Sequence, residues 1–165
     1  TVTAIPNWTF QDCKYLEHVN WHDGITSIGE AAFNRCTSLR NIRIPAGVTS
    51  IADDMFYLCT KLNGVVLSKQ TATIEDWAFA GTALTGISLP ATVTSLGDNV
   101  FHNCSELIGV QSYPTTAPTI TATTFSHDKG TIKEQCRLFV LPTASSAYDS
   151  WKNYFKSLVA DLTVQ

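Results

Sequence analysis

Hydrophobic residues recur along this chain with a period of about 23 positions. One column consists of phenylalanines spaced 23, 23, 23, 22 and 24 residues apart: Phe10, Phe33, Phe56, Phe79, Phe101 and Phe125. Three aliphatic columns keep the same period: Leu16, Leu39, Leu62, Leu84 and Leu107; Ile5, Ile28, Ile51, Ile74 and Leu96; and Val19, Ile42, Val65, Ile87 and Val110. Such a period is typical of solenoids, in which each unit buries its apolar side only by stacking on the next. Solenoids offer an extended binding surface more often than a catalytic cleft.

A single unit of the pattern predicts a short strand and a short helical turn. Residues 16–21 alternate between polar and apolar positions, which indicates a strand with Val19 and Trp21 facing inward. Residues 25–28 form a second extended or turn-like piece. Residues 31–37 are long enough for only about two turns of helix or 3-10 helix.

A column of acidic or amide residues precedes each expected helical turn: Asn7, Glu30, Asp53, Asp76 and Asp98. Side-chain oxygens at this position cap free backbone N–H groups at the start of a helix. The alternative is a ladder of calcium ligands. Calcium-binding repeats are rich in Gly and Asp and have a shorter period, so we favour capping.

Four of the five cysteines share one slot of the repeat, three residues after a phenylalanine: Cys13, Cys36, Cys59 and Cys104. Thr82 occupies this slot in the remaining coil. A slot that accepts Cys or Thr is expected to be small and buried, where free Cys acts as a compact hydrophobe. A metal site needs ligands that converge on one point, which a ladder of one residue per coil does not provide. Cys136 lies outside the ladder, and the sequence does not indicate its state.

The repeat degrades after Leu107 and gives way to a different C-terminal segment. Residues 144–158 are expected to be helical, with one apolar face made by Tyr148, Trp151, Phe155 and Leu158. Solenoids need their open edge covered, and this segment is the expected cover. We therefore assign residues 1–126 to about five repeats of 22–24 residues, the first of them partial, and residues 127–165 to a capping segment of the same domain.

Composition narrows the classes of partner. The chain has 165 residues, of which 44% are hydrophobic and 15% charged, with a net charge of −3. These values favour a folded domain and give no electrostatic reason to expect nucleic acid as a partner. No apolar run approaches the ~20 residues of a membrane-spanning helix, so we expect no membrane insertion. The chain opens at Thr1 within a repeat, and we expect a longer parent protein whose localisation signal is absent from this chain.

The repeat closely resembles one known family. Residues 39–62 and 84–97 share the pattern of columns, with Pro45 and Pro90 at equivalent places, and residues 138–155 look like a family-specific ending. These features resemble the BspA-like leucine-rich repeats of bacterial surface proteins. The resemblance implies an α/β solenoid: a short right-handed stack with a parallel β-sheet on one face, short helical or 3-10 turns, and a C-terminal helical cap. It also implies secretion or cell-surface location and adhesion to host matrix proteins or to other cells, and it brings no catalytic residues.

The outward face of the expected sheet supplies most candidate binding residues. Alternation directs these side chains outward: His18, Asn20, His22, Asn41, Arg43, Gln111 and Tyr113. His18 and His22 lie ~13 Å apart along a strand, too far to share one metal ion. They are expected to be solvated surface side chains.

Trp8 and Trp77 are candidates on another side of the solenoid. Their slot also holds Ala31, Asp54 and Asn99, so it is expected to tolerate solvent. An exposed Trp can stack on a sugar or anchor a protein partner. The alternative is a contact with neighbouring loops or with parts of the protein outside this chain.

The sequence shows no Gly-rich phosphate loop, no His-Glu-x-x-His motif and no nucleophile placed beside a base. We therefore expect no enzyme activity, no metal and no cofactor. The first hypothesis is a binding module for a host matrix or cell-surface protein. The alternatives are a structural spacer, which self-associates through an N-terminal edge containing Val2, Ile5 and Phe10, and a glycan-binding module that uses Trp8 or Trp77.

Overall fold

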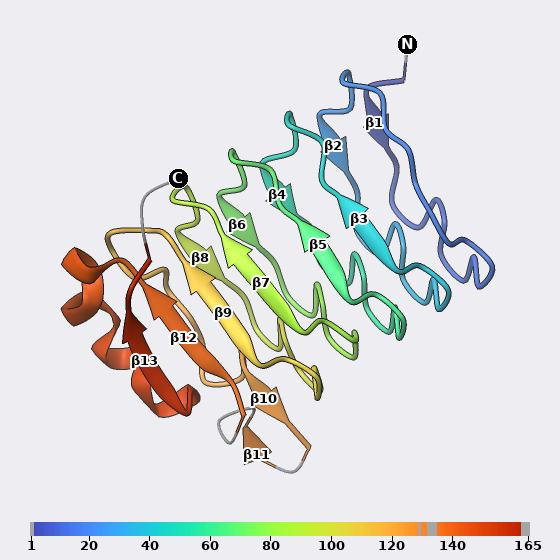
Figure 1. The fold of residues 1–165 in the computed structure, drawn as a ribbon. Coiled ribbons are helices and arrows are strands. Elements are labelled where there is room, and N and C mark those ends of the chain that lie inside the picture. Colours follow the sequence, from blue (N-terminus) through green and yellow to red (C-terminus); the bar gives the residue numbers. More distant parts are fainter. Residues whose placement is uncertain (1, 129, 132–134, 163–165) are drawn as a thin grey trace.

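The computed structural model describes residues 2–128, 130–131 and 135–162. The chain winds into a solenoid whose coils stack from the N-terminus to the C-terminus (Figure 1). A main sheet of parallel strands covers one face. In it β3 (Asn41–Arg43) pairs with β5 (Gly64–Val66), and β5 lies beside β7 (Gly86–Leu89). The sheet continues through β9 (Gly109–Ser112), β12 (Arg137–Val140) and β13 (Ser157–Ala160). The predicted leucine-rich repeat solenoid with a parallel sheet is confirmed.

The ends of the main sheet differ from the prediction. Residues 16–21 form no strand, and one 3.5 Å hydrogen bond from Arg40 N to Glu17 O links this stretch to the next coil. At the other end, β12 and β13 belong to the main sheet, although they lie in the segment expected to be only a cap. The sheet is therefore shifted toward the C-terminus relative to the prediction.

A second face carries strands of only two residues each. They are β1 (Ala4–Ile5), β2 (Ser27–Ile28), β4 (Ser50–Ile51), β6 (Thr73–Ile74) and β8 (Ser95–Leu96). β1 pairs with β2, and β4, β6 and β8 form one parallel ladder. A short antiparallel hairpin, β10 (Ser126–His127) with β11 (Gly130–Thr131), projects near the C-terminal end (Figure 1).

Consecutive turns, and no helix, form the third side of each coil, so the expected helical turn at residues 31–37 is wrong. Phe33 N donates to Met55 O of the next coil at 3.0 Å, whereas Asn34 N donates to Ala31 O of its own coil at 3.1 Å. This alternation leaves no continuous i→i−4 pattern, which an α-helix requires. Ala31 and Arg35 have positive φ angles of 51° and 59°. We call this side, with residues 8–12, 31–35, 54–58, 77–81 and 99–103, the turn face.

The acidic column does cap backbone N–H groups, but those of the adjacent coil. Asn7 Oδ1 accepts a hydrogen bond from Glu30 N at 3.1 Å, and Asp53 Oδ1 accepts one from Asp76 N at 2.8 Å. Asp76 Oδ1 accepts in the same way from Asp98 N at 2.7 Å. Each cap therefore ties two coils together.

The phenylalanine column is the spine of the core. Neighbouring rings stack with centroids 5.2–5.9 Å apart and planes within 19° of parallel. Phe33, Phe56, Phe79, Phe101 and Phe125 are fully buried. Each ring is therefore covered by the ring of the next coil, as the period predicts.

The cysteine ladder lies beside this spine and bonds to its backbone. Cys59 Sγ donates to Phe33 O at 3.0 Å, and Thr82 Oγ1 donates to Phe79 O at 2.8 Å. The slot therefore selects a small side chain with a donor, which explains why Thr can stand in the place of Cys in one coil. Cys36, Cys59 and Cys104 are buried as expected. Cys13 is exposed, contrary to the prediction, because no coil of the described chain covers its side.

The C-terminal segment covers the last ring of the spine. A 3-10 helix (Pro142–Tyr154) replaces the helix expected over residues 144–158, and Leu158 lies in β13. Phe155 and Trp151 pack on Phe125 with ring centroids 4.8 and 5.6 Å away. Trp151 Nε1 donates to Pro118 O at 3.2 Å, which fixes the segment to the proline-rich loop.

Candidate binding site

Two rows of outward residues run across the main sheet. Strand register aligns the first row, and the second lies two residues further along each strand, so both face solvent. The first row is Asn41, Gly64, Gly86, Gly109 and Arg137. The second row is Arg43, Val66, Ser88, Gln111 and Phe139. Three neighbouring strands thus present glycine in the first row, where the backbone itself forms the surface.

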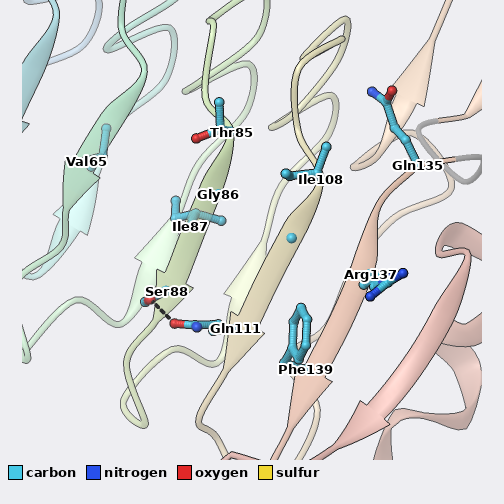
Figure 2. Close-up of a pocket in the computed structure, with 11 residues that line it drawn as sticks. Val65, Thr85, Gly86, Ile87, Ser88, Ile108, Gln111, Gln135, Arg137 and Phe139 are labelled. Carbon is cyan, nitrogen blue, oxygen red and sulfur yellow. Dashed lines mark hydrogen bonds between the residues drawn. The ribbon is translucent and has the colours of Figure 1, made fainter.

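Gly86 and Gly109 form the floor of a shallow depression of about 580 Å³, which we call the sheet depression. Figure 2 shows its lining, with Gly86 on β7, Gln111 on β9, and Arg137 and Phe139 on β12. A Cβ added at Gly109 would lie 3.5 Å from Phe139 Cε2, so the ring edge borders the space that the glycine leaves open. The missing side chains therefore create the hollow.

The rim of the sheet depression combines apolar and hydrogen-bonding groups. Ile108 is 58% exposed, and Val66 on the neighbouring β5 is 53% exposed. Ser88 Oγ donates to Gln111 Oε1 at 2.7 Å, which orients the amide of Gln111 across the two strands (Figure 2). The Nε2 group of Gln111 has no partner among the described residues, so it is available to a ligand.

The charge on this face is positive. Arg43 and Arg137 are exposed at either side of the sheet depression, and neither forms an ion pair within the described part of the chain. The two rows contain no carboxylate. A carboxylate of a partner would therefore find guanidinium groups without competition, and guanidinium binds carboxylate with two parallel hydrogen bonds.

The structure brings only part of the predicted set to this depression. Gln111 lines it, and Asn41 and Arg43 lie on β3, which is separated from the strand of Gln111 by β5 and β7. Tyr113 is half-buried and packs against the core beyond the end of β9. His18, Asn20 and His22 are exposed in the first coil, away from the depression. Among residues 2–128 and 135–162, no three His, Cys, Asp or Glu side chains are placed to hold a metal ion.

Sequence reasoning missed Ile108, Arg137 and Phe139. β12 follows β9 after 28 residues, because Val110 pairs with Leu138, and the longer spacing hid it. The signal was present, since Leu138, Val140 and Pro142 repeat the apolar spacing of earlier strands. Aligning these residues with the Ile87 column would have placed Phe139 on the outward face.

Trp8 and Trp77 lie on the turn face, away from the sheet depression. Trp8 is 55% exposed. Trp77 is half-buried, and its ring meets Tyr57 edge-on with centroids 5.9 Å apart and His102 with centroids 5.3 Å apart. The slot is less open than predicted, because Ala31 is buried in it.

Comparison with known proteins places these features in context. A family model described as "BspA type Leucine rich repeat region" matches residues 1–108 in six copies. A leucine-rich cell surface protein from Faecalibacterium prausnitzii A2-165 is 27% identical, with a TM-score of 0.68 over 96% of this chain and 47% of its own.

Two further solved structures share the fold at 18% identity and a TM-score of 0.64. One is a leucine-rich repeat protein from Bacteroides ovatus ATCC 8483, matched over 96% of this chain and 55% of its own. The other is the pneumococcal vaccine antigen PcpA, matched over 86% of this chain and 40% of its own. The chain therefore spans about half the length of these proteins or less. No curated protein matches, and no helix among the described residues is long and apolar enough to cross a membrane.

Proposed function

The chain belongs to the BspA type leucine-rich repeat family, and we propose that it is a non-enzymatic protein-interaction module of a bacterial surface protein. We assign the partner site to the main sheet, at the sheet depression. Residues 127–165 serve as the cap of the same domain as the repeats. The surface location of the F. prausnitzii relative supports the same location for this chain.

The sheet depression is the observation that carries this proposal. Interface hot spots combine a pocket, an apolar anchor and a few directed polar groups. Here the floor is glycine backbone, the apolar rim is Ile108 with Phe139, and the polar groups are Gln111 and Arg137. Hydrogen-bonded strands hold all of them, so binding requires little reorganisation.

The chemistry of the rim indicates what the partner presents. An apolar side chain fits the glycine floor, and a carboxylate fits Arg137 or Arg43. Six strands at ~4.8 Å spacing give the sheet a width of only about 24 Å. Its strands are short as well, so the area of this face is small compared with the ~800 Å² that each partner buries in a standard interface. We therefore expect an acidic, partly apolar protein segment, bound with modest affinity, and we propose matrix or host cell-surface proteins as its source.

The test is binding of the purified chain to immobilised extracellular-matrix proteins, measured by surface plasmon resonance. Arg137→Glu and Ile108→Ser change the rim without touching the core. Lys14→Glu is the matched control, because it makes the same charge change at an exposed position in the first coil. Binding weakened at least tenfold by the rim variants and unchanged in the control supports the proposal.

Binding that survives both rim variants would move the partner site off the main sheet. If the purified chain bound none of the immobilised matrix or cell-surface proteins, the adhesion proposal would be contradicted. Concentration-dependent dimers in light scattering would then favour self-association through the N-terminal edge, where Val2 is 61% exposed.

A further inference from the structure

A second depression of about 360 Å³ lies on the turn face, on a different side of the solenoid from the sheet depression. Six residues from four successive coils line it: Gln11, Asn34, Arg35, Asp54, Tyr57 and Trp77. None of these residues lines the sheet depression. The protein-binding proposal leaves this constellation unexplained.

An aromatic pair forms one wall. Tyr57 and Trp77 meet at 81° with ring centroids 5.9 Å apart, and His102 packs against the other side of Trp77 at 66°. Trp77 is thus fixed between two rings, yet it keeps part of its surface in the depression. A rigid, partly exposed indole offers a flat apolar surface to a ligand, and binding there costs little conformational entropy because the ring is already fixed.

The buried amide of Asn34 also lines this depression. Asn34 is only 7% exposed, and its Oδ1 atom has no hydrogen-bond partner among the described residues. An unsatisfied buried acceptor is costly, and native proteins rarely keep one without a reason. A ligand hydroxyl that displaced the side chains at the mouth of the depression would supply the missing donor.

Asp54 and Arg35 add an acceptor and a donor at the mouth. Asp54 is half-buried, and its carboxylate accepts no hydrogen bond from the described residues. Burial raises the pKa of Asp54, and the neighbouring Asp53 and Glu30 carboxylates raise it further. A ligand that donates hydrogen bonds would therefore stabilise the ionised carboxylate.

We propose that this depression binds a neutral sugar. The C–H face of a pyranose packs on an aromatic ring, and its hydroxyl groups both donate and accept. Donation would go to Asp54 and Asn34, and acceptance would come from Arg35. The surrounding carboxylates disfavour an acidic sugar, because like charges repel at short range.

The test combines a glycan array with calorimetry. The array carries neutral oligosaccharides of glucose, galactose, mannose, fucose and N-acetylglucosamine, and any oligosaccharide that the chain retains is titrated in solution. We expect a Kd of about 1 mM or tighter. Asp54→Ala should weaken it at least tenfold without unfolding the coil, because Ala31 occupies the same slot with a φ of 51°, close to the 54° of Asp54.

Controls separate this site from its surroundings and from the sheet depression. Trp77→Ala should also weaken binding at least tenfold, whereas Trp8→Ala, an exposed Trp in the same slot that does not line the depression, should leave the Kd unchanged. Arg137→Glu should also leave it unchanged, since Arg137 belongs to the sheet depression. Retention of no neutral glycan, retention of acidic glycans alone, or equal binding by Asp54→Ala would each overturn the proposal.

Discussion

Replacing Phe56 by Ala removes an interior ring of the spine. Phe56 is fully buried and stacks on Phe33 at 5.6 Å and on Phe79 at 5.5 Å. Burial of a Phe side chain contributes about 1.5–3 kcal/mol, and each aromatic pair adds about 0.5–1.5 kcal/mol. The sum agrees with the roughly 3–5 kcal/mol that core Phe→Ala substitutions cost. We therefore expect the free energy of unfolding to fall by about that amount.

The assay is urea unfolding followed by circular dichroism, with Phe10→Ala as the matched control. Phe10 belongs to the same column, but it is half-buried and stacks on Phe33 alone. Its removal should cost less than half as much as the removal of Phe56. Equal losses for the two variants, or a loss below 1 kcal/mol for Phe56→Ala, would refute the idea that stacked coils carry the stability.

Four further measurements address the thiols, the sheet depression and the cap. A thiol reagent at pH 8 should label Cys13 alone in the native protein, and a second native label would contradict the burial of the others: Cys36, Cys59, Cys104 and Cys136. Burial raises the pKa of Cys36 and Cys136 to about 12 and of Cys104 to about 11, against about 8.5 in an unfolded chain. The folded state thus holds these protons more tightly than the unfolded state. The free energy of unfolding measured in urea should therefore be constant up to about pH 8 and fall between about pH 9 and 12; a free energy that does not change over this range would contradict the burial of these thiols. Gly86→Ala with Gly109→Ala should raise the floor of the sheet depression and weaken partner binding while the melting temperature holds, because neither new Cβ comes closer than 3.4 Å to its neighbours. Tyr148→Phe should cost about 1–2 kcal/mol, since its buried hydroxyl donates to Pro114 O at 3.0 Å; an unchanged urea midpoint would show that bond to be dispensable.

The stacking direction could be predicted because it depends only on periodicity. Residues one period apart in the sequence must lie above each other in a solenoid, so the Phe rings and the cysteine slot followed from spacing. The turn face could not be predicted in the same way. Whether Phe33 N donates within its coil or to Met55 O of the next coil depends on the neighbouring coil, which local sequence does not encode.

The sheet depression was predicted only in part for a related reason. Gln111 followed from alternation within a regular repeat. Arg137 and Phe139 reach the same hollow through a strand that pairs after 28 residues, where the period no longer applies. The hollow itself depends on glycines aligned across strands, and that alignment becomes visible only when the register is known.

The left-handed residues of the turn face change how substitutions should be chosen in this protein. In each coil of this face, two positions four residues apart have positive φ. Among these positions in the described chain, only position 81 is a glycine. A left-handed conformation costs other residues roughly 1 kcal/mol, so replacing Asp12, whose φ is 59°, by glycine should relieve strain where glycine usually weakens a fold. The same two positions recur along this face, but Arg35, Asp54 and Trp77 line the depression there and Ala31 is buried. Asp12 is exposed and lines neither depression, so a glycine at this position offers a thermostabilisation route that leaves the core, the sheet and both depressions untouched.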